Sequence, residues 1–228
     1  MNDVTRLRLI GERAAAEVQT GMFVGLGTGS TAAAMLEALA VRVNDGLQIT
    51  GVATSESTRA LCARLGIPLV ELDRVDHLDL CIDGADEIDP HLDIVKGRGG
   101  ALLYEKLVAL RAKRLVVIAN AEKLVDQLGT RLPLPVEVVP FGYLHTGKLI
   151  EDLGLKPVLR QQDDATPYLT DGGHFILDCR SHGIQNAPDL AAQLKSITGV
   201  VDHGLFIDMT DLALTIDAQG TISELARP

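Results

Sequence analysis

The stretch Met22-Phe23-Val24-Gly25-Leu26-Gly27-Thr28-Gly29-Ser30-Thr31 is an apolar run followed at once by a loop of glycines and hydroxyl residues. The apolar run predicts a short buried strand over 22–26. A helix is predicted from Ala32 to about Val43, because Ser30 or Thr31 can cap its first turn. A strand that turns directly into a helix is the repeating element of a parallel sheet covered by helices.

The same alternation of strand and helix continues on both sides of this stretch. Apolar residues at helical spacing predict an amphipathic first helix from Val4 to Val18. Further strands are expected at 48–53, 78–82 and 115–119, and a helix at 56–65 that ends at Gly66. We therefore predict an α/β fold with a Rossmann-like, mostly parallel sheet flanked by helices. In such sheets, ligands bind beyond the carboxyl ends of the strands.

A smaller second domain is predicted after a cluster of prolines, Pro133, Pro135 and Pro140. From there the expected order is strand, helix, strand, strand, helix, strand, over 136–139, 143–153, 157–160, 175–179, 188–197 and 200–205. This is the order of the split βαβ, ferredoxin-like α+β unit. We therefore expect a Rossmann-like catalytic domain at 1–132 and 206–228, and the smaller α+β domain at 133–205.

The composition argues against several classes of partner. Apolar residues make up 46% of the 228 residues and aromatic residues only 3%, which predicts an aliphatic core. The net charge of −10 argues against nucleic acid, whose binding depends on Lys and Arg. Charges interrupt the N-terminal apolar positions and no apolar run is long enough to span a bilayer, so neither a signal peptide nor a membrane partner is expected. A reducing cytoplasm is expected from three isolated cysteines without disulfide or zinc spacing, Cys62, Cys81 and Cys179.

The glycine-rich loop is the first candidate binding site. Every second residue from Gly25 to Gly29 is glycine, so successive backbone N–H groups can point toward an anion at the helix N-terminus. Hydroxyl donors are added by Thr28, Ser30 and Thr31. The pattern lacks the third glycine of a dinucleotide site and the lysine of a nucleotide-binding P-loop, so a phosphate monoester is the preferred ligand. The alternative is a tight turn whose glycines serve packing alone.

A second candidate site is the acidic turn Asp83-Gly84-Ala85-Asp86-Glu87 together with the loop Lys96-Gly97-Arg98-Gly99-Gly100. Clustered like charges cannot all stay ionised unless a cation or a ligand offsets them, and Lys96 is a candidate cation. The same carboxylates could instead form a solvated acidic loop or a magnesium or manganese site, although no histidine motif accompanies them. A cation, carboxylates and backbone N–H groups together are what proton transfer next to a carbonyl requires.

Glu105 lies about one turn into the helix that begins after Gly100. Leu103, Leu107 and Leu110 share one helical face, and Glu105 points the opposite way. Glu105 is therefore either an ordinary exposed residue or a carboxylate that faces an anion bound at the Lys96–Gly100 loop. The second alternative arises because the helix starts at that loop.

With these residues the chain resembles the A-type ribose-5-phosphate isomerases. The resemblance covers nearly the full length, in order, at 25–31, 83–88, 96–103, 133–138, 199–201 and 204–206. It implies interconversion of D-ribose 5-phosphate and D-ribulose 5-phosphate in the non-oxidative pentose phosphate pathway. It further implies a phosphosugar as the only partner besides a second copy, a cytoplasmic homodimer or higher homo-oligomer, and neither cofactor nor metal.

The resemblance also implies roles for particular residues. Glu105 matches the catalytic base, which would move a proton between C2 and C1 through an enediolate. The other catalytic residues that the resemblance implies are Asp83, Asp86 and Lys96. The substrate-binding residues that it implies are Thr28, Gly29, Ser30, Thr31, Gly84, Ala85, Gly97, Arg98, Gly99 and Lys123.

Two positions depart from the pattern of this family. Leu7 stands where relatives often carry a lysine, so that Arg6 or Arg8 would have to supply the charge. Tyr104 replaces the arginine that is usual before the glutamate. Neither position belongs to the proton-transfer residues, so these departures concern affinity rather than chemistry.

Two functions of other classes stay open on the sequence. The first is a non-catalytic phosphosugar-sensing domain of the same fold, and the second is an amino-sugar phosphate isomerase-deaminase. A sensor usually carries a basic DNA-binding segment, and a deaminase would place a histidine beside the acidic loop; neither feature is evident. No role is assigned to Ser55 or Ser57, which lack a nearby base, or to the six histidines.

Overall fold

The computed structural model describes residues 2–227, which divide into two compact units. The first unit consists of residues up to Ala85, Tyr104–Lys123 and residues from Met209 on. The second unit consists of Asp86–Leu103 and Leu124–Asp208. Each unit has its own sheet and its own hydrophobic core. The domain boundaries inferred from the sequence stay predictions.

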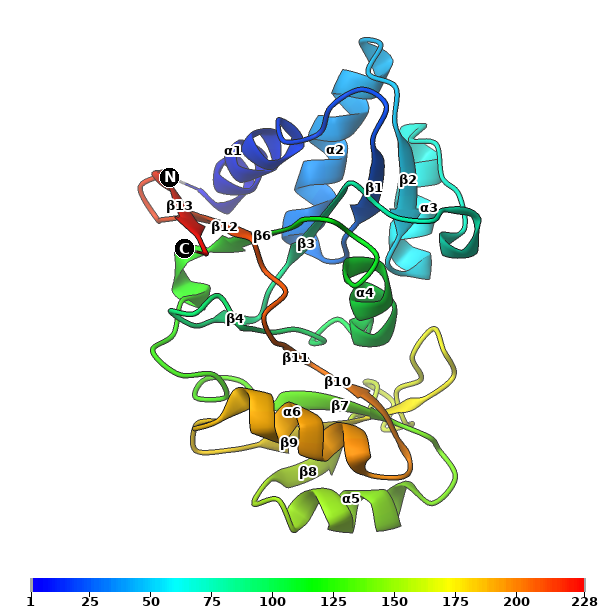
Figure 1. The fold of residues 1–228 in the computed structure, drawn as a ribbon, viewed down its shortest axis with the longest axis vertical. Helices are drawn as coiled ribbons and strands as arrows, with labels where there is room; N and C mark the ends of the chain where they lie inside the picture. The colour runs from blue at the N-terminus through cyan, green and yellow to red at the C-terminus, as the bar shows by residue number, and fades with distance from the viewer. Residues whose placement is uncertain (1, 228) are drawn as a thin grey trace. The chain divides into compact units, whose positions relative to one another are not determined.

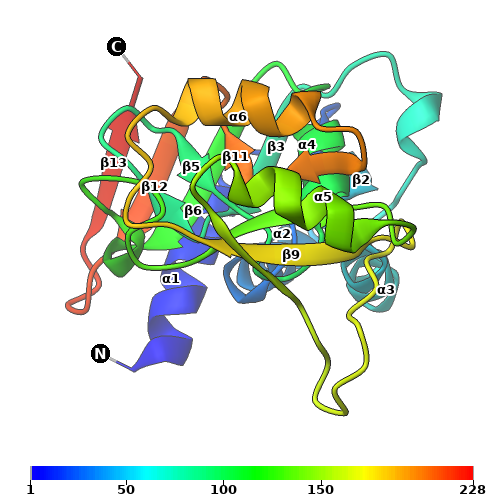
Figure 2. The ribbon, with the colours of Figure 1, turned by 90° about the horizontal axis from the view of Figure 1, so that it is seen from below.

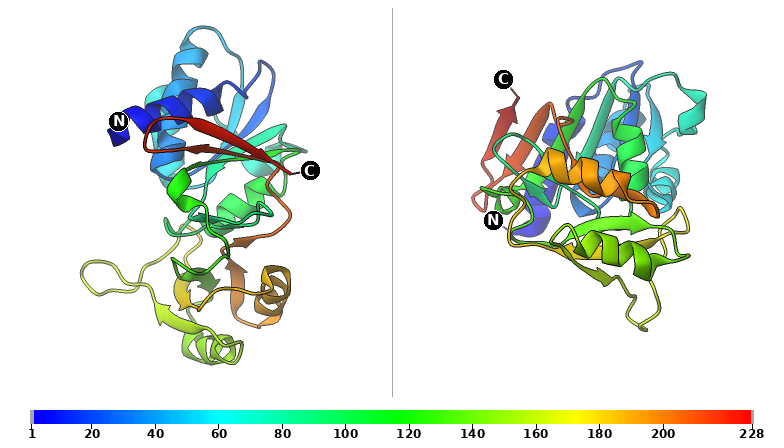
Figure 3. Two further views of the ribbon diagram at one scale, coloured as in Figure 1. Left: turned by 90° about the vertical axis from the view of Figure 1, so that its left-hand side faces the viewer. Right: turned by 60° about the horizontal axis from the view of Figure 1, so that its bottom comes forward.

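The first unit is built on a six-stranded sheet. Its strands are β1 (Phe23–Leu26), β2 (Thr50–Ala53), β3 (Leu80–Gly84), β6 (Leu115–Asn120), β12 (Leu212–Ile216) and β13 (Ile222–Ala226). Their order is β13-β12-β6-β3-β1-β2 (Figure 1). All neighbouring pairs are parallel except the β12–β13 hairpin, drawn in red in Figure 3. The predicted mostly parallel α/β fold is confirmed.

Four helices accompany this sheet. They are α1 (Asp3–Ala15), α2 (Ser30–Asn44), α3 (Glu56–Leu65) and, from Tyr104 on, α4 (Leu102–Ala109), with 3-10 turns η1 (Leu72–Arg74) and η2 (Ala121–Lys123). Helices α1 and α2 lie side by side (Figure 1), and a Cβ on Gly11 would come within 2.6 Å of the Ala34 backbone. The core between helices and sheet is aliphatic, together with Met35 and Cys62. No helix within residues 2–227 is long and apolar enough to cross a bilayer.

The helix ends follow local signals, with one difference from the prediction. Ser55 Oγ accepts the N–H of Thr58 at the start of α3, and left-handed Gly66 (φ 72°) ends that helix. Helix α2 was predicted to carry a hydroxyl cap, and this is wrong. It begins at Ser30 after Gly29, whose φ is 107° and which makes no side-chain cap bond. Glycine takes this φ readily, so a backbone turn, not a hydroxyl, starts α2.

The second unit contains a four-stranded antiparallel sheet. Its elements, in the predicted order, are β7 (Leu134–Val138), α5 (Tyr143–Glu151), β8 (Lys156–Leu159), β9 (Phe175–Arg180), α6 (Ala187–Ser196) and β10 (Val200–His203). The strand order is β10-β7-β9-β8. Both helices cover one face (Figure 2), because alternate β7 residues Leu134, Val136 and Val138 share a core with Ile150 and Leu194. This is the ferredoxin-like arrangement of the split βαβ unit.

A smaller antiparallel sheet in the second unit carries the segments around Lys96. Its strands are β4 (Glu87–Ile88), β5 (Ile94–Val95) and β11 (Leu205–Phe206), ordered β11-β5-β4. The N–H of Lys96 donates to the Gly204 carbonyl at 2.8 Å, and the N–H of Asp86 donates to the Val95 carbonyl at 2.8 Å. These bonds place the acidic turn next to the start of the glycine-rich loop.

Candidate functional site

The glycine-rich loop after β1 contacts the end of β3 within the first unit. The side chain of Asp83 is buried, and its Oδ1 accepts the N–H groups of Thr28 at 3.0 Å and Gly84 at 2.7 Å. Gly27 permits this approach, since a Cβ there would lie 2.3 Å from Asp83 Oδ1. Hydrogen bonds to a carboxylate are among the strong ones, so they hold the loop against the strand end. The glycine-rich segment 25–31 and the start of the acidic turn therefore meet at the carboxyl edge of this sheet.

The hydroxyl of Thr28 belongs to a network inside the first unit. Its Oγ1 lies 2.8 Å from Thr54 Oγ1, 2.7 Å from Ser55 Oγ and 3.0 Å from Thr58 Oγ1. Thr58 Oγ1 in turn donates to the Gly27 carbonyl at 2.9 Å. A hydroxyl has a single proton, and Thr28 donates its proton to Ser55. Thr28 therefore anchors the loop to the turn between β2 and α3.

No sequence motif pointed to Thr54, Ser55 and Thr58. The signal that identifies them is their position directly after β2, which pairs in parallel with β1. Residues that follow neighbouring parallel strands lie at the same edge of a sheet. Hydroxyl residues after β2 are therefore candidates to support the loop after β1.

Ser30 and Thr31 stand in the first turn of α2. Ser30 and Gly29 are exposed, and Thr31 is half-buried. Backbone N–H groups and hydroxyls at a helix N-terminus provide a setting that anions favour. Beside this turn the first unit has a hollow of about 270 Å3 between α2 and α3, lined by Gly29, Ser30, Ala33, Leu36, Ser57, Thr58, Leu61 and Arg64. Sequence reasoning did not single out Arg64, which is the cation at this hollow.

Glu105 is buried on α4, with 5% of its surface exposed. On the opposite side, Leu107 of α4 and Leu110 just after it are 46% and 64% exposed, whereas Leu102 at the start of α4 is fully buried. The side of α4 that carries Glu105 therefore faces the protein, and the side that carries Leu107 faces solvent. Val108, one turn further on, packs against β1, where a Cβ on Gly25 would meet its Cγ1 at 2.6 Å. Because α4 returns to the start of β6, Glu105 lies nearer than Val108 to the carboxyl edge.

Leu7 and Lys123 bear on how a phosphate could be held in the first unit. Lys123 is half-buried in η2, directly after β6. The Arg6 side chain is 12% exposed, and its Nη1 lies 3.8 Å from a carboxylate oxygen of Glu122 in the same turn. Arg8 is 63% exposed and pairs with a glutamate of its own helix, while Leu7 lines a groove between α1 and α2. Of the two arginines, Arg6 is the one beside η2.

In the second unit, backbone N–H groups hold the carboxylates of the acidic turn. Asp86 Oδ2 accepts the N–H of Arg98 at 2.9 Å. Glu87 is 1% exposed, and its carboxylate accepts three N–H groups, those of Gly129 at 2.5 Å, Arg131 at 2.8 Å and Leu132 at 2.9 Å. Residues 2–227 contain no group of three or more His, Cys, Asp or Glu side chains placed to ligate a metal. Glu87 supports the loop at 129–132, and Asp86 fixes the start of the Lys96–Gly100 loop.

Lys96 opens that loop and is 4% exposed. Its Nζ lies 5.8 Å from the centre of the Phe206 ring, within cation–π range. The backbone N–H of Lys96 donates a hydrogen bond to the carbonyl of Gly204, which directly precedes β11. This bond fixes the start of the Lys96–Gly100 loop. A buried ammonium is the kind of group that stabilises developing negative charge in a water-poor site.

The backbone of the loop leaves a defined pair of donors. Positive φ angles at Gly97 (105°) and Gly100 (81°) turn the chain. The N–H of Arg98 is bonded to Asp86, and the N–H of Gly100 donates to the Gly97 carbonyl at 3.0 Å. Within residues 2–227, the N–H groups of Gly97 and Gly99 donate to no acceptor. These two groups are the loop's available backbone donors.

The structure divides the four predicted catalytic residues between the units. Asp83 and Glu105 belong to the first unit, and Asp86 and Lys96 belong to the second. The chain crosses between the units just before Asp86 and, within α4, just before Tyr104. The catalytic and binding roles inferred for these residues from the sequence stay predictions.

Together, the fold and these groups define an α/β protein equipped to hold a phosphorylated small molecule and to move protons. A sequence model of the family described as ribose 5-phosphate isomerase A (phosphoriboisomerase A) matches residues 50–220. The chain belongs to this family, and the resemblance noted from the motifs is confirmed.

Similar proteins span the whole chain. A ribose-5-phosphate isomerase A of Roseiflexus sp. (strain RS-1) is 49% identical, covering 100% of this chain and 98% of that protein. One of Synechococcus sp. (strain JA-3-3Ab) is 53% identical, covering 92% of each. A solved D-ribose-5-phosphate isomerase in complex with phospho-erythronic acid has a TM-score of 0.96 at 34% identity, covering 100% of both chains. The ribose 5-phosphate isomerase A of Methanocaldococcus jannaschii has a TM-score of 0.92 at 34% identity, covering 99% of this chain and 100% of that one.

Proposed function

We propose that this chain is an aldose-ketose isomerase that interconverts D-ribose 5-phosphate and D-ribulose 5-phosphate in the non-oxidative pentose phosphate pathway. Membership of the ribose 5-phosphate isomerase A family supports this activity. The observation that carries it is the burial of Glu105, 5% exposed, on a helix that leaves Leu107 46% exposed. Burial of a carboxylate costs free energy, whereas burial of a leucine stabilises the fold. A chemical role is therefore the best reason for the burial of Glu105.

In the proposed reaction Glu105 acts as the base for both half-reactions. Its carboxylate takes the proton from C2 of the open-chain aldose, the C–H electron pair forms the enediolate double bond, and the C1 oxygen takes the charge. Glu105 then returns the proton to C1, while the C2 hydroxyl proton passes to the charged C1 oxygen and the ketose carbonyl forms at C2. One carboxylate in one protonation cycle therefore suffices, and no oxidant or reductant is consumed.

The remaining catalytic residues act on oxygens. Lys96 and the N–H groups of Gly97 and Gly99 stabilise the oxyanion, and each such donor is worth about 3 kcal/mol. Asp83 and Asp86 relay hydroxyl protons, including the one that moves when the sugar ring opens. Support for these roles comes from burial of Asp83 and Lys96 and from the resemblance of the motifs.

The phosphate is proposed to bind through the first turn of α2. Ser30, Thr31 and the N–H groups after Gly29 are the donors, and Lys123 is the cation. Thr28 contributes by anchoring the loop, because its proton is donated to Ser55. The remaining substrate-binding residues are proposed to be Gly84, Ala85 and Arg98.

The setting of the enzyme is also proposed. It works in the cytoplasm as a homodimer or higher homo-oligomer, without metal or cofactor, on a phosphosugar alone. The resemblance supports the oligomer and the compartment. A sensing domain and an amino-sugar phosphate isomerase-deaminase are not favoured, because the curated relatives at about this chain's full length carry the isomerase name.

The test is turnover of ribose 5-phosphate by the purified chain and by Glu105→Gln. The variant should lose roughly 10²- to 10⁴-fold in kcat, since the amide cannot accept the proton. Glu37→Gln is the matched control, because Glu37 is an exposed glutamate on α2 and should turn over like the wild type. Near-normal kcat in Glu105→Gln, with Glu37→Gln unchanged, would remove Glu105 as the base.

A chelator arm tests the rest of the proposal. Wild-type turnover should be the same with and without a chelator that binds divalent cations. A wild-type chain that converts no ribose 5-phosphate would defeat the proposed activity, and a chelator-sensitive rate would restore the metal interpretation of the acidic turn.

A further inference from the structure

Arg160 lies at the end of β8 and binds the glycine-rich loop within the second unit. Its Nη1 donates to the Gly97 carbonyl at 2.9 Å and to the Arg98 carbonyl at 3.0 Å. Its Nε and Nη2 donate to Asp178 on β9 at 2.9 Å and 2.5 Å. The side chain of Arg160 is 14% exposed and that of Asp178 is 24% exposed. Four hydrogen bonds therefore leave from one rigid, planar guanidinium.

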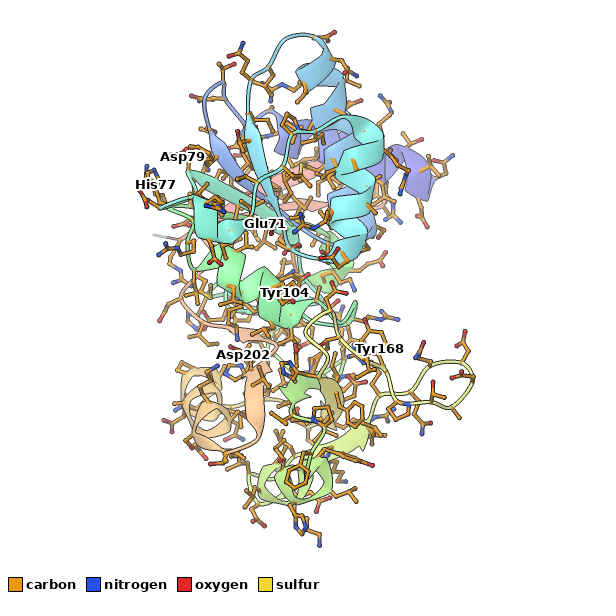
Figure 4. The ribbon with its side chains drawn as sticks, turned by 90° about the vertical axis from the view of Figure 1, so that its right-hand side faces the viewer. Glu71, His77, Asp79, Tyr104, Tyr168 and Asp202 are labelled. Carbon is orange, nitrogen blue, oxygen red and sulfur yellow. The ribbon has the colours of Figure 1, made fainter. Side chains whose placement is uncertain are left out.

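Tyr168 binds the same loop from the segment between β8 and β9 (Figure 4). Its hydroxyl donates to the Gly99 carbonyl at 3.3 Å, and its ring centre lies 5.8 Å from Arg160 Cζ. Gly100 permits the approach, since a Cβ there would lie 2.2 Å from the Tyr168 hydroxyl. Three successive carbonyls of the loop, at 97, 98 and 99, are thus held from one side.

The segment that carries Tyr168 is itself anchored. Thr170 Oγ1 donates to Glu137 Oε1 at 2.9 Å, and His174 Nδ1 lies 2.9 Å from the same oxygen. The N–H of Tyr168 donates to the Arg160 carbonyl at 3.0 Å. Tyr168 therefore stands on backbone that is fixed at both ends, which is what a positioning residue requires.

Holding the carbonyls also sets where the N–H groups point. In a trans peptide the C=O and the following N–H point in opposite directions, and no described peptide is cis. The Gly97–Arg98 peptide is held at both ends, by Arg160 at its oxygen and by Asp86 at its N–H. In the next peptide Arg160 holds the oxygen, so the N–H of exposed Gly99 is turned to the opposite, open side.

We propose that Arg160, held by Asp178 and assisted by Tyr168, positions the Lys96–Gly100 loop so that the Gly99 N–H is preset to donate to an oxygen of the phosphosugar. This assignment rests on the proposed function and adds to it residues that touch the loop, not the reacting atoms. Arg160 and Tyr168 are accordingly positioning residues. A loop displaced by about 1 Å can cost on the order of 10²-fold in rate, so the effect is measurable.

The experiment compares Arg160→Ala with Arg180→Ala, a matched arginine that is exposed at the end of β9. Arg160→Ala should lose about 10- to 100-fold in kcat/KM, whereas Arg180→Ala should stay at the wild-type value. Added guanidinium should restore part of the loss in Arg160→Ala, and the same ionic strength of sodium chloride should not. Amide hydrogen exchange of Arg98 and Gly100 should accelerate by about tenfold in Arg160→Ala, because one net hydrogen bond is worth about that factor.

Each outcome decides the proposal. Wild-type-like kcat/KM in Arg160→Ala, or a loss that guanidinium does not reverse together with unchanged amide exchange, would overturn it. If Arg160→Ala does not fold, Arg160→Lys and Tyr168→Phe take its place, since lysine keeps the charge but cannot bridge Asp178 and two carbonyls. If the wild type shows no isomerase activity, the proposed function fails, and amide exchange in the loop alone then decides whether Arg160 positions it.

Discussion

Gly27→Ala should lower the free energy of unfolding of the first unit, whereas Gly84→Ala should change it little. A Cβ on Gly27 would lie 2.3 Å from Asp83 Oδ1 and 2.6 Å from Asp83 Cα, which belongs to the backbone of β3 and cannot rotate away. Such overpacking costs about 1–3 kcal/mol. Separating the loop from β3 also removes the bond from the Thr28 N–H to the Asp83 carboxylate, worth about 1.5–3 kcal/mol. The expected loss of unfolding free energy is therefore about 2.5–6 kcal/mol.

The control is Gly84→Ala, because the N–H of Gly84 donates to the same Asp83 oxygen as the N–H of Thr28. A Cβ on Gly84 would have its nearest neighbours at 3.9 Å, and this glycine has no positive φ. Its unfolding free energy should change by no more than about 1 kcal/mol. Urea unfolding followed by circular dichroism gives both values, with comparable slopes against denaturant. Equal unfolding free energies for the two variants would refute the steric reasoning.

Three further predictions follow from buried polar contacts. Thr28→Val removes a hydroxyl that contacts three other hydroxyls, so it should lower the unfolding free energy by about 1–3 kcal/mol. Ser30 is exposed, so Ser30→Ala should leave the unfolding free energy unchanged and raise KM. Equal unfolding free energies of the two variants in urea would contradict this. Glu87→Ala leaves three N–H groups without their acceptor and should cost about 3 kcal/mol or more, so an unchanged Tm in a thermal scan would exclude the assigned support role. Burial raises the pKa of the Glu137 carboxyl above its ordinary value, so wild-type stability should fall relative to Glu137→Gln as pH rises through that raised pKa. A difference in urea unfolding that stays constant with pH would show that the pKa is not raised, and one that grows in favour of the wild type would show that the sign is wrong.

The order of strands and helices could be predicted because its signals are local. The apolar run before Gly25, the hydroxyl of Ser55 at the start of α3 and the left-handed Gly66 at its end each act over a few residues. The six-element order of the second unit followed in the same way from alternating apolar runs. The one wrong start, at α2, arose because Gly29 turns the backbone without any side-chain bond.

Which face of α4 is buried could not be predicted from the periodicity of its apolar residues. Its leucines suggest a face turned toward the core, yet Leu107 and Leu110 are exposed and Glu105 is buried. Helical periodicity states which residues share a face but not which face the rest of the protein covers. Its position one turn after the Lys96–Gly100 loop made Glu105 a candidate, and the motif resemblance, not the periodicity, implied its role as the base.

By itself, then, the amino-acid sequence determined the α/β class and the ferredoxin-like order of the second unit, and it pointed to the segments proposed to carry the chemistry, because glycine, proline and apolar spacing act on neighbouring residues. Only the tertiary structure decided which side chains support those segments. Thr28 meets Ser55 across 27 residues, and Arg160 meets Gly97 across 63. Such pairs have no local signature, since a hydrogen bond between distant residues depends on how strands are ordered in a sheet and on which loops that order brings together.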